Sequence, residues 1–167
     1  YILYTFKYNA DYTSDSQTAY SVTFDEPDGT ECDILIVGGG GGGGGNGQGA
    51  GGGAGAVIYY QGLTLNGLYN VKVGKGANSI NNQNRGDNGD DSLLYRTNDN
   101  LQMFVAKGGG GGATWNSSGY NARDGGSGGG GAGGSASVNG AGGLLISGNV
   151  VNDVNISISN NSYNNTG

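Results

Sequence analysis

Short apolar or alternating runs recur along the whole chain, and polar or glycine-rich stretches separate them. Runs of this length and composition are typical of β-strands. No window offers an apolar residue at every third or fourth position for three turns, so α-helix is nearly excluded. We therefore expect an all-β fold of short antiparallel strands with essentially no α-helix. The predicted strands are 2–8, 19–24, 31–37, 56–60, 63–65, 68–73, 92–96, 101–107, 144–146 and 149–159.

Two of these runs allow a statement about burial. Residues 19–24 alternate between apolar and polar, which places Tyr20, Val22 and Phe24 on one face of the strand. Residues 31–37 end in a continuous apolar stretch, and such a strand is expected to be buried on both faces.

Turn and loop signals separate the runs. The sequence Glu26-Pro27-Asp28-Gly29 predicts a tight turn, because proline presets φ and glycine accepts the positive φ that follows. Asn66-Gly67 lies between two predicted strands and predicts a hairpin. Residues 78–91 are polar and rich in asparagine, so we expect a loop there.

Two glycine tracts directly follow apolar runs. Residues 38–45 are eight consecutive glycines after Val37, and residues 108–112 are five more after Lys107. Because glycine loses more backbone entropy on ordering than any other residue, such a tract is either a disordered linker or an element that only glycine can build. These tracts lie between short strands rather than between domains. We therefore expect polyproline-II-like helices that pack side by side and pair their backbone groups laterally.

Composition is consistent with one domain of 167 residues, divided into N-terminal strands (1–37), glycine tracts with loops (38–143) and C-terminal strands with a polar tail (144–167). A net charge of −6 is too small to hold the chain open, and 11 tyrosines supply large rings for burial. The mild acidity argues against a nucleic-acid partner. No apolar run approaches the length of a membrane span, so we expect no membrane insertion.

The chain offers little chemistry for catalysis. It has no histidine and a single cysteine, Cys32, so the commonest general base and an intrachain disulfide are both absent. Glycines 38, 40 and 43 mimic a dinucleotide fingerprint, but eight glycines cannot open the helix that would hold a pyrophosphate. We expect no catalytic residues, no enzyme activity and no cofactor.

A cluster of acids and amides raises the question of a metal. Asp87, Asp90 and Asp91, with Asn84 and Asn88, could chelate a hard cation through their oxygens. Their spacing matches no calcium loop. We therefore favour a solvated loop and expect no metal site.

Aromatic and polar side chains in the second glycine region form a candidate binding surface. Trp115, Asn116, Tyr120 and Arg123 lie on a background of glycine, serine and asparagine, as in loops that bind sugars or polar protein epitopes. The alternative is that Trp115 and Tyr120 cap a glycine bundle or lie at a seam between subunits.

The order of segments resembles the glycine-rich domain of phage tail fibres, and related domains of surface and fibre proteins of large DNA viruses. The resemblance runs from about Thr30 to Gly143 and depends on Cys32–Val37 before the glycines, Gly55–Tyr59, Leu65–Gly74 and Gly89–Ser92. The many asparagines depart from the phage members and favour a large eukaryotic virus.

This resemblance implies a structural or adhesive module of a virion surface fibre or tail fibre, with a host glycan or protein as partner. It also implies a location on the virion surface or outside the cell, and self-association into a homo-oligomer such as a trimer or a filament. The alternative is a repeating subunit of a non-viral extracellular filament or matrix that has no receptor.

Overall fold

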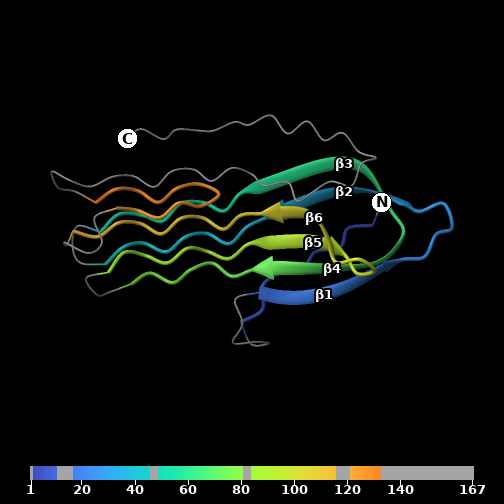
Figure 1. Cartoon of the computed structure of the whole chain (residues 1–167), viewed down its shortest axis with the longest axis horizontal. Coiled ribbons are helices and arrows are strands. Elements are labelled where there is room, and N and C mark those ends of the chain that lie inside the picture. The colour runs from blue at the N-terminus through green and yellow to red at the C-terminus, as the bar shows by residue number, and fades with distance from the viewer. Residues whose placement is uncertain (1, 11–16, 46–48, 81–83, 116–120, 133–167) are drawn as a thin grey trace.

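The chain folds into a strand half and a glycine half, placed end to end (Figure 1). The computed structural model describes residues 2–10, 17–45, 49–80, 84–115 and 121–132. Strands on one side continue into extended glycine-rich tracts on the other side, so the chain passes repeatedly between the halves. The predicted strands at 144–146 and 149–159 lie outside the described residues.

Six antiparallel strands form two sheets. One sheet has four strands in the order β1-β4-β5-β6, and the other pairs β2 with β3. The described residues contain no helix, so the prediction of an all-β fold is confirmed. Among these residues there is accordingly no helix long and apolar enough to span a membrane. The strands are β1 (Gln17–Phe24), β2 (Thr30–Val37), β3 (Val57–Leu65), β4 (Gly67–Gly74), β5 (Ser92–Arg96) and β6 (Leu101–Ala106).

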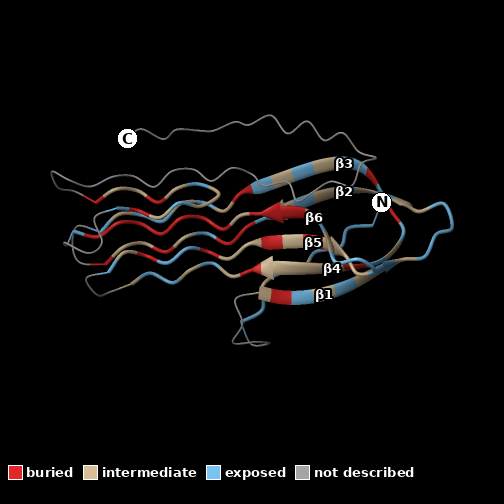
Figure 2. Ribbon diagram, in the orientation of Figure 1, coloured by how far each residue is buried: buried red, intermediate tan, exposed pale blue. Residues whose placement is uncertain are grey.

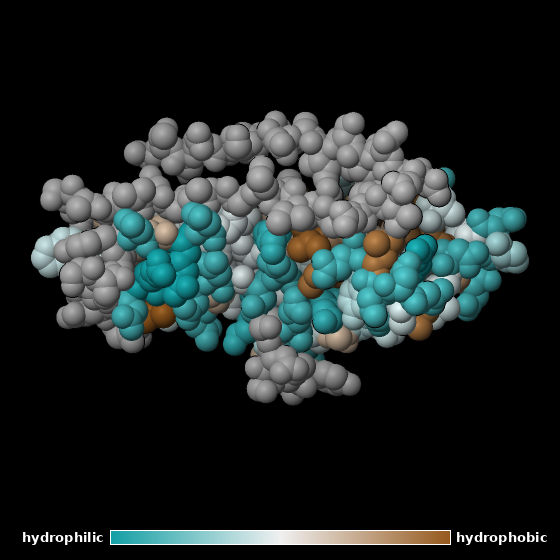
Figure 3. All heavy atoms as spheres, in the orientation of Figure 1, coloured by the Kyte–Doolittle hydropathy of each residue, from teal (hydrophilic) through white to brown (hydrophobic). Residues whose placement is uncertain are grey.

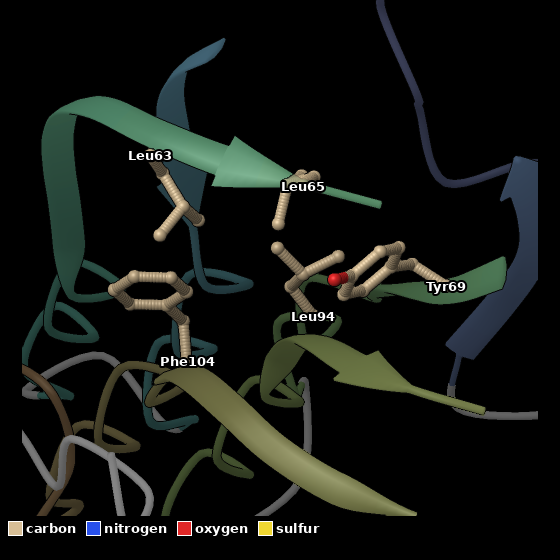
Figure 4. Packing of buried hydrophobic residues seen from close by; sticks show 5 residues of the cluster. All are labelled: Leu63, Leu65, Tyr69, Leu94 and Phe104. Atoms are coloured by element: carbon tan, nitrogen blue, oxygen red, sulfur yellow. The ribbon is translucent and has the colours of Figure 1, made fainter. Parts of the chain in front are cut away.

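The hydrophobic core lies between the two sheets (Figure 4). Leu63 and Leu65 of β3 face Tyr69, Leu94 and Phe104 of the larger sheet. Phe104 is only 2% exposed, and its ring centroid lies 5.7 Å from that of Tyr60. This cluster holds the two sheets together, because neither sheet could bury its apolar face alone.

The segment 2–8 is not a strand, contrary to the prediction. It runs beside β1 without a backbone ladder and is held by side chains instead. The hydroxyl of Tyr20 donates to the carbonyl of Lys7 at 2.5 Å, and the ring of Phe6 lies 5.3 Å from that of Tyr20. Aromatic and β-branched residues favour a strand only where a neighbouring strand edge pairs with them.

Strand β2 is buried on one face only, so the prediction of burial on both faces is wrong. Its residues alternate between half-buried and exposed, with Leu35 and Val37 pointing outward. The inner face packs on the core, whereas no described element covers the outer face. The alternation predicted for 19–24 is confirmed in β1.

The two predicted turns are corners between sheets. The N–H of Gly29 donates to the carbonyl of Glu26 at 2.9 Å, and its φ of +81° confirms the turn between β1 and β2. Asn66-Gly67 does not close a hairpin, because β3 pairs with β2 and β4 pairs with β1 and β5. The positive φ of Gly67, +92°, instead lets the chain cross from one sheet to the other.

Candidate functional site

The tract 38–45 continues β2 and has a period of three residues. Its N–H groups alternate between two antiparallel neighbours, 49–56 and 84–91, and every third N–H has no partner among the described residues. A period of three with lateral bonds is that of a polyproline-II helix in a bundle. The donations are Gly38 to Ala56, Gly41 to Gly53 and Gly44 to Ala50 on one side, and Gly39 to Asp90, Gly42 to Asp87 and Gly45 to Asn84 on the other.

The same period governs how closely the tracts approach one another. A Cβ added to Gly41 would lie 2.1 Å from the carbonyl oxygen of Gly110, and one added to Gly44 would lie 2.0 Å from that of Ala113. A Cβ added to Gly40 would meet nothing within 4 Å. The glycines are therefore packed rather than linker-like. No helix begins after Val37, so the fingerprint of glycines 38, 40 and 43 lacks the element that would bind a pyrophosphate.

The tract that continues β6 is the centre of the bundle. Residues 108–114 are all buried, and Figure 2 shows this buried tract running on from β6. It contacts the tract 38–45, the two tracts that run back towards the strands, and the hairpin 121–132. Thr114 is fully buried, and its hydroxyl donates to the carbonyl of Gly45 at 2.5 Å.

Two polar side chains take the place of backbone carbonyls in this bundle. Asn88 Oδ1 accepts from the N–H of Gly111 and Asp91 Oδ1 accepts from the N–H of Gly108, each at 2.9 Å. Asp91 also pairs with the ammonium of Lys107 at 2.6 Å. Asn88 and Asp91 are three residues apart, which matches the three-residue period of the glycine helices. This spacing is the sequence signal from which their role as acceptors could have been predicted.

The prediction that 78–91 is a loop is therefore wrong for residues 84–91, which form a packed tract. Asparagine and aspartate are read as loop residues because they compete for backbone hydrogen bonds, and here they supply bonds that the bundle needs. The described residues hold no group of three acidic, cysteine or histidine side chains suited to a metal. Asp91 instead accepts the hydrogen bond of Gly108 and pairs with Lys107 inside the bundle.

Asp91→Ala should lower the free energy of unfolding by about 1–3 kcal/mol, because the N–H of Gly108 loses its acceptor in a part-buried position. Asp91→Asn keeps one acceptor oxygen and should cost less. Urea denaturation of both variants measures this difference. Equal losses would show that the ion pair with Lys107, and not the hydrogen bond, provides the stability.

Burial raises the pKa of Asp90 above its usual value, Lys75 acts in the opposite direction, and the charge of Asp91 adds to the rise. A raised folded pKa means that stability is lost as the pH rises through it. We expect Asp90→Asn to be more stable relative to the parent chain at pH 7 than at pH 3. A stability difference that does not change between these two pH values would contradict the expectation.

The predicted binding residues lie in different places. Trp115 is at the end of the central tract farthest from the strands, and it is 49% exposed. Arg123 lies in the hairpin 121–132, where its Nε donates to the carbonyl of Gly86 at 2.9 Å and its guanidinium lies 3.2 Å from Asp87. Asn116 and Tyr120 lie outside the described residues. Arg123 therefore has a bundle-forming role, which the sequence did not reveal.

The far end of the bundle gathers the ends of three tracts. Gly45 receives the hydroxyl hydrogen bond of Thr114 and donates its N–H to Asn84 at 3.0 Å. Trp115 follows Thr114 at this end and is half exposed. The bundle thus fixes residues of three tracts next to Trp115.

Residues 13–166 match the family described as a glycine-rich domain. No curated protein and no solved structure matches the chain. The match agrees with the packed tracts, which account for why glycine is required at so many positions. The chain therefore belongs to the glycine-rich domain family.

Proposed function

We propose that the chain is a structural and adhesive module of a virion surface fibre or tail fibre. The observation that carries this proposal is the junction of Gly45, Asn84 and Thr114, which holds three glycine-rich tracts together at one end of the bundle beside the exposed Trp115. Loops held by a rigid scaffold are where binding residues concentrate in proteins. The partner is a host-surface glycan or protein, the location is the virion surface or the extracellular space, and no reaction is assigned.

The bundle suits this role because it makes a long, stiff element from little apolar surface. Each tract bonds laterally to several others that are remote in sequence, so no tract can move alone. Figure 3 shows a largely hydrophilic face over the glycine half and apolar patches over the strand half. Binding through sugars or polar epitopes is consistent with the hydrophilic half, and Trp115 supplies an aromatic surface for stacking.

The viral assignment rests on the resemblance of the sequence to tail-fibre and large-virus domains. Self-association into a homo-oligomer, a trimer or a filament, is part of the proposal. The alternative, a subunit of a non-viral extracellular filament without a receptor, draws support from the exposed apolar residues Ile2, Leu3 and Tyr4, which self-association could bury. Electron micrographs of the native source separate the two: fibres on capsids or tails, against free polymers.

Replacing Trp115 and Tyr120 together with serine tests the adhesive role. A glycan array and a cell-binding assay measure adhesion, and light scattering measures assembly. Loss of binding with intact assembly supports adhesion, whereas loss of assembly places these residues at a subunit seam. Tyr4→Ser is the matched control, because Tyr4 is an exposed tyrosine on the strand half and should leave binding unchanged. Unchanged binding and assembly in the double variant would remove this region from the function.

A further inference from the structure

Two apolar surfaces are exposed on the described part of the strand half, and the first is the outer face of the β2–β3 sheet. It is formed by Leu35, Val37, Val57 and Tyr59, each 50–65% exposed, and is called the apolar patch. Leu35 pairs with Tyr59 in the ladder and Val37 pairs with Val57, so the four side chains adjoin. The patch lies next to the glycine half, because Val37 leads directly into the tract 38–45. A compact apolar area of this kind marks an interaction site rather than scattered exposure.

The second surface is the run Ile2-Leu3-Tyr4, called the apolar segment, whose side chains are 67–88% exposed. The residues that follow it attach the chain to β1. The carbonyl of Lys7 accepts from the hydroxyl of Tyr20, and the N–H of Asn9 donates to the hydroxyl of Thr18 at 2.9 Å. The chain therefore runs antiparallel to β1, and the apolar segment lies towards the end of β1 at residue 24.

The two surfaces lie at opposite ends of the strand half. Gln17, at the start of β1, pairs with Gly74, the last residue of β4, and the chain then enters the glycine half. The end of β1 at Phe24 is therefore the end away from the glycine half, whereas the apolar patch is next to it. The length of β1 is eight residues, or about 26 Å of extended chain. Because the surfaces also belong to different sheets, they do not meet within one copy.

The charges beside the two surfaces have opposite signs. Glu31 and Asp33 share the exposed face of β2 with Leu35, and Lys7 follows the apolar segment and is exposed. No ion pair within the described residues uses any of these three charged side chains. Lys7 lies four positions after Leu3. The acid at position 31 lies four positions before Leu35, so an antiparallel arrangement with Leu3 on Leu35 brings this acid level with Lys7.

We propose that the apolar segment of one copy docks on the apolar patch of a second copy, with Lys7 beside the acids of β2. The inference rests on the self-association that is part of the proposed function, and it names the two surfaces that meet. Since these surfaces differ, the contact is head-to-tail and repeats from copy to copy, which is how a filament grows when the rotation does not close a ring. Trp115, at the far end of the glycine bundle, stays outside this contact.

Analytical ultracentrifugation of the whole chain over a range of concentrations tests the proposal. Leu35→Ser with Tyr59→Ser removes the patch, and Leu3→Ser with Tyr4→Ser removes the segment. Each double variant should weaken association at least about tenfold, because it takes two apolar side chains out of the contact. All four side chains are exposed, so both variants should keep the fold, which far-ultraviolet circular dichroism checks.

A mixture of the two double variants gives the most specific result. The patch variant keeps its segment and the segment variant keeps its patch, so each mixed pair retains one intact contact. Head-to-tail docking predicts that neither variant polymerises alone and that the mixture forms dimers and nothing larger. Loss of association in only one of the two variants would overturn the proposal, because the surface removed in that variant would then pair with its own kind.

Reversal of the charges gives an independent test that removes no apolar side chain. Lys7→Glu should weaken association at low ionic strength, and adding Glu31→Lys to the same chain should restore it. Lys72→Glu makes the same charge change on β4 and should leave association unchanged. No restoration by the second substitution would contradict the proposed pairing of Lys7 with the acids of β2.

The remaining outcomes separate this inference from the proposed function. A parent chain that associates, but is unaffected by the patch and segment variants, would overturn the inference and leave self-association in place. A parent chain that stays monomeric at every concentration would overturn both. Adhesion is measured separately on the glycan array, so neither result changes the test of Trp115.

Discussion

Gly41→Ala should lower the free energy of unfolding by about 3 kcal/mol, at the upper end of what overpacking costs. The added Cβ would lie 2.1 Å from the carbonyl oxygen of Gly110, and the clash is with backbone of the central tract, which cannot rotate away as a side chain can. Relief therefore requires two tracts to separate, which also weakens their lateral hydrogen bonds.

Gly40→Ala is the matched control, one residue earlier in the same tract. Its Cβ would meet nothing within 4 Å, and Gly40 is exposed and has no positive φ. Replacing glycine with alanine at such a position should be neutral or add about 0.4–1 kcal/mol, because the unfolded chain loses freedom. Equal urea midpoints for the two variants would rule out close packing of this tract.

Phe104→Ala should cost about 3–5 kcal/mol, because it leaves a cavity in the centre of the core. Phe104 is 2% exposed, contacts the ring of Tyr60, and lies four residues before Gly108, where the central glycine tract begins. We expect the strands and the glycine half to unfold together, since β6 and the central tract are one continuous segment.

Leu3→Ala provides the comparison, because Leu3 is 88% exposed and its truncation should change stability by no more than about 0.5 kcal/mol. Thermal denaturation followed by far-ultraviolet circular dichroism measures both variants. A Phe104→Ala chain with the stability of Leu3→Ala would show that the sheets are not held together by this cluster.

The strands were predictable because their apolar residues have the period of an extended chain, as in β1. Which strands pair with which was harder to predict from the sequence. Asn66-Gly67 supplies the positive φ that a hairpin needs, but a corner between sheets needs the same φ. In β2 the exposed residues Leu35 and Val37 are as apolar as residues of the core. Hydropathy alone does not say which apolar face of a strand is buried.

The packing of the glycine tracts was predictable from their position between short strands, but their neighbours were not. A run of identical residues contains no register information, so only the flanking strands fix which glycine faces which tract. Asn88 and Asp91 were read as loop residues because their side-chain bonds to Gly111 and Gly108 are remote in sequence. Arg123 was read as a ligand-binding residue for the same reason.

Site-resolved amide hydrogen exchange across residues 38–45 tests most directly whether the glycine tracts form a bonded bundle. The account predicts slow exchange at Gly38, Gly39, Gly41, Gly42, Gly44 and Gly45, each of which donates a lateral hydrogen bond. It predicts fast exchange at Gly40 and Gly43, which donate none among the described residues. Two protected amides followed by one unprotected amide would show the three-residue period directly. Uniformly fast exchange across the tract would contradict the bundle and restore a disordered linker.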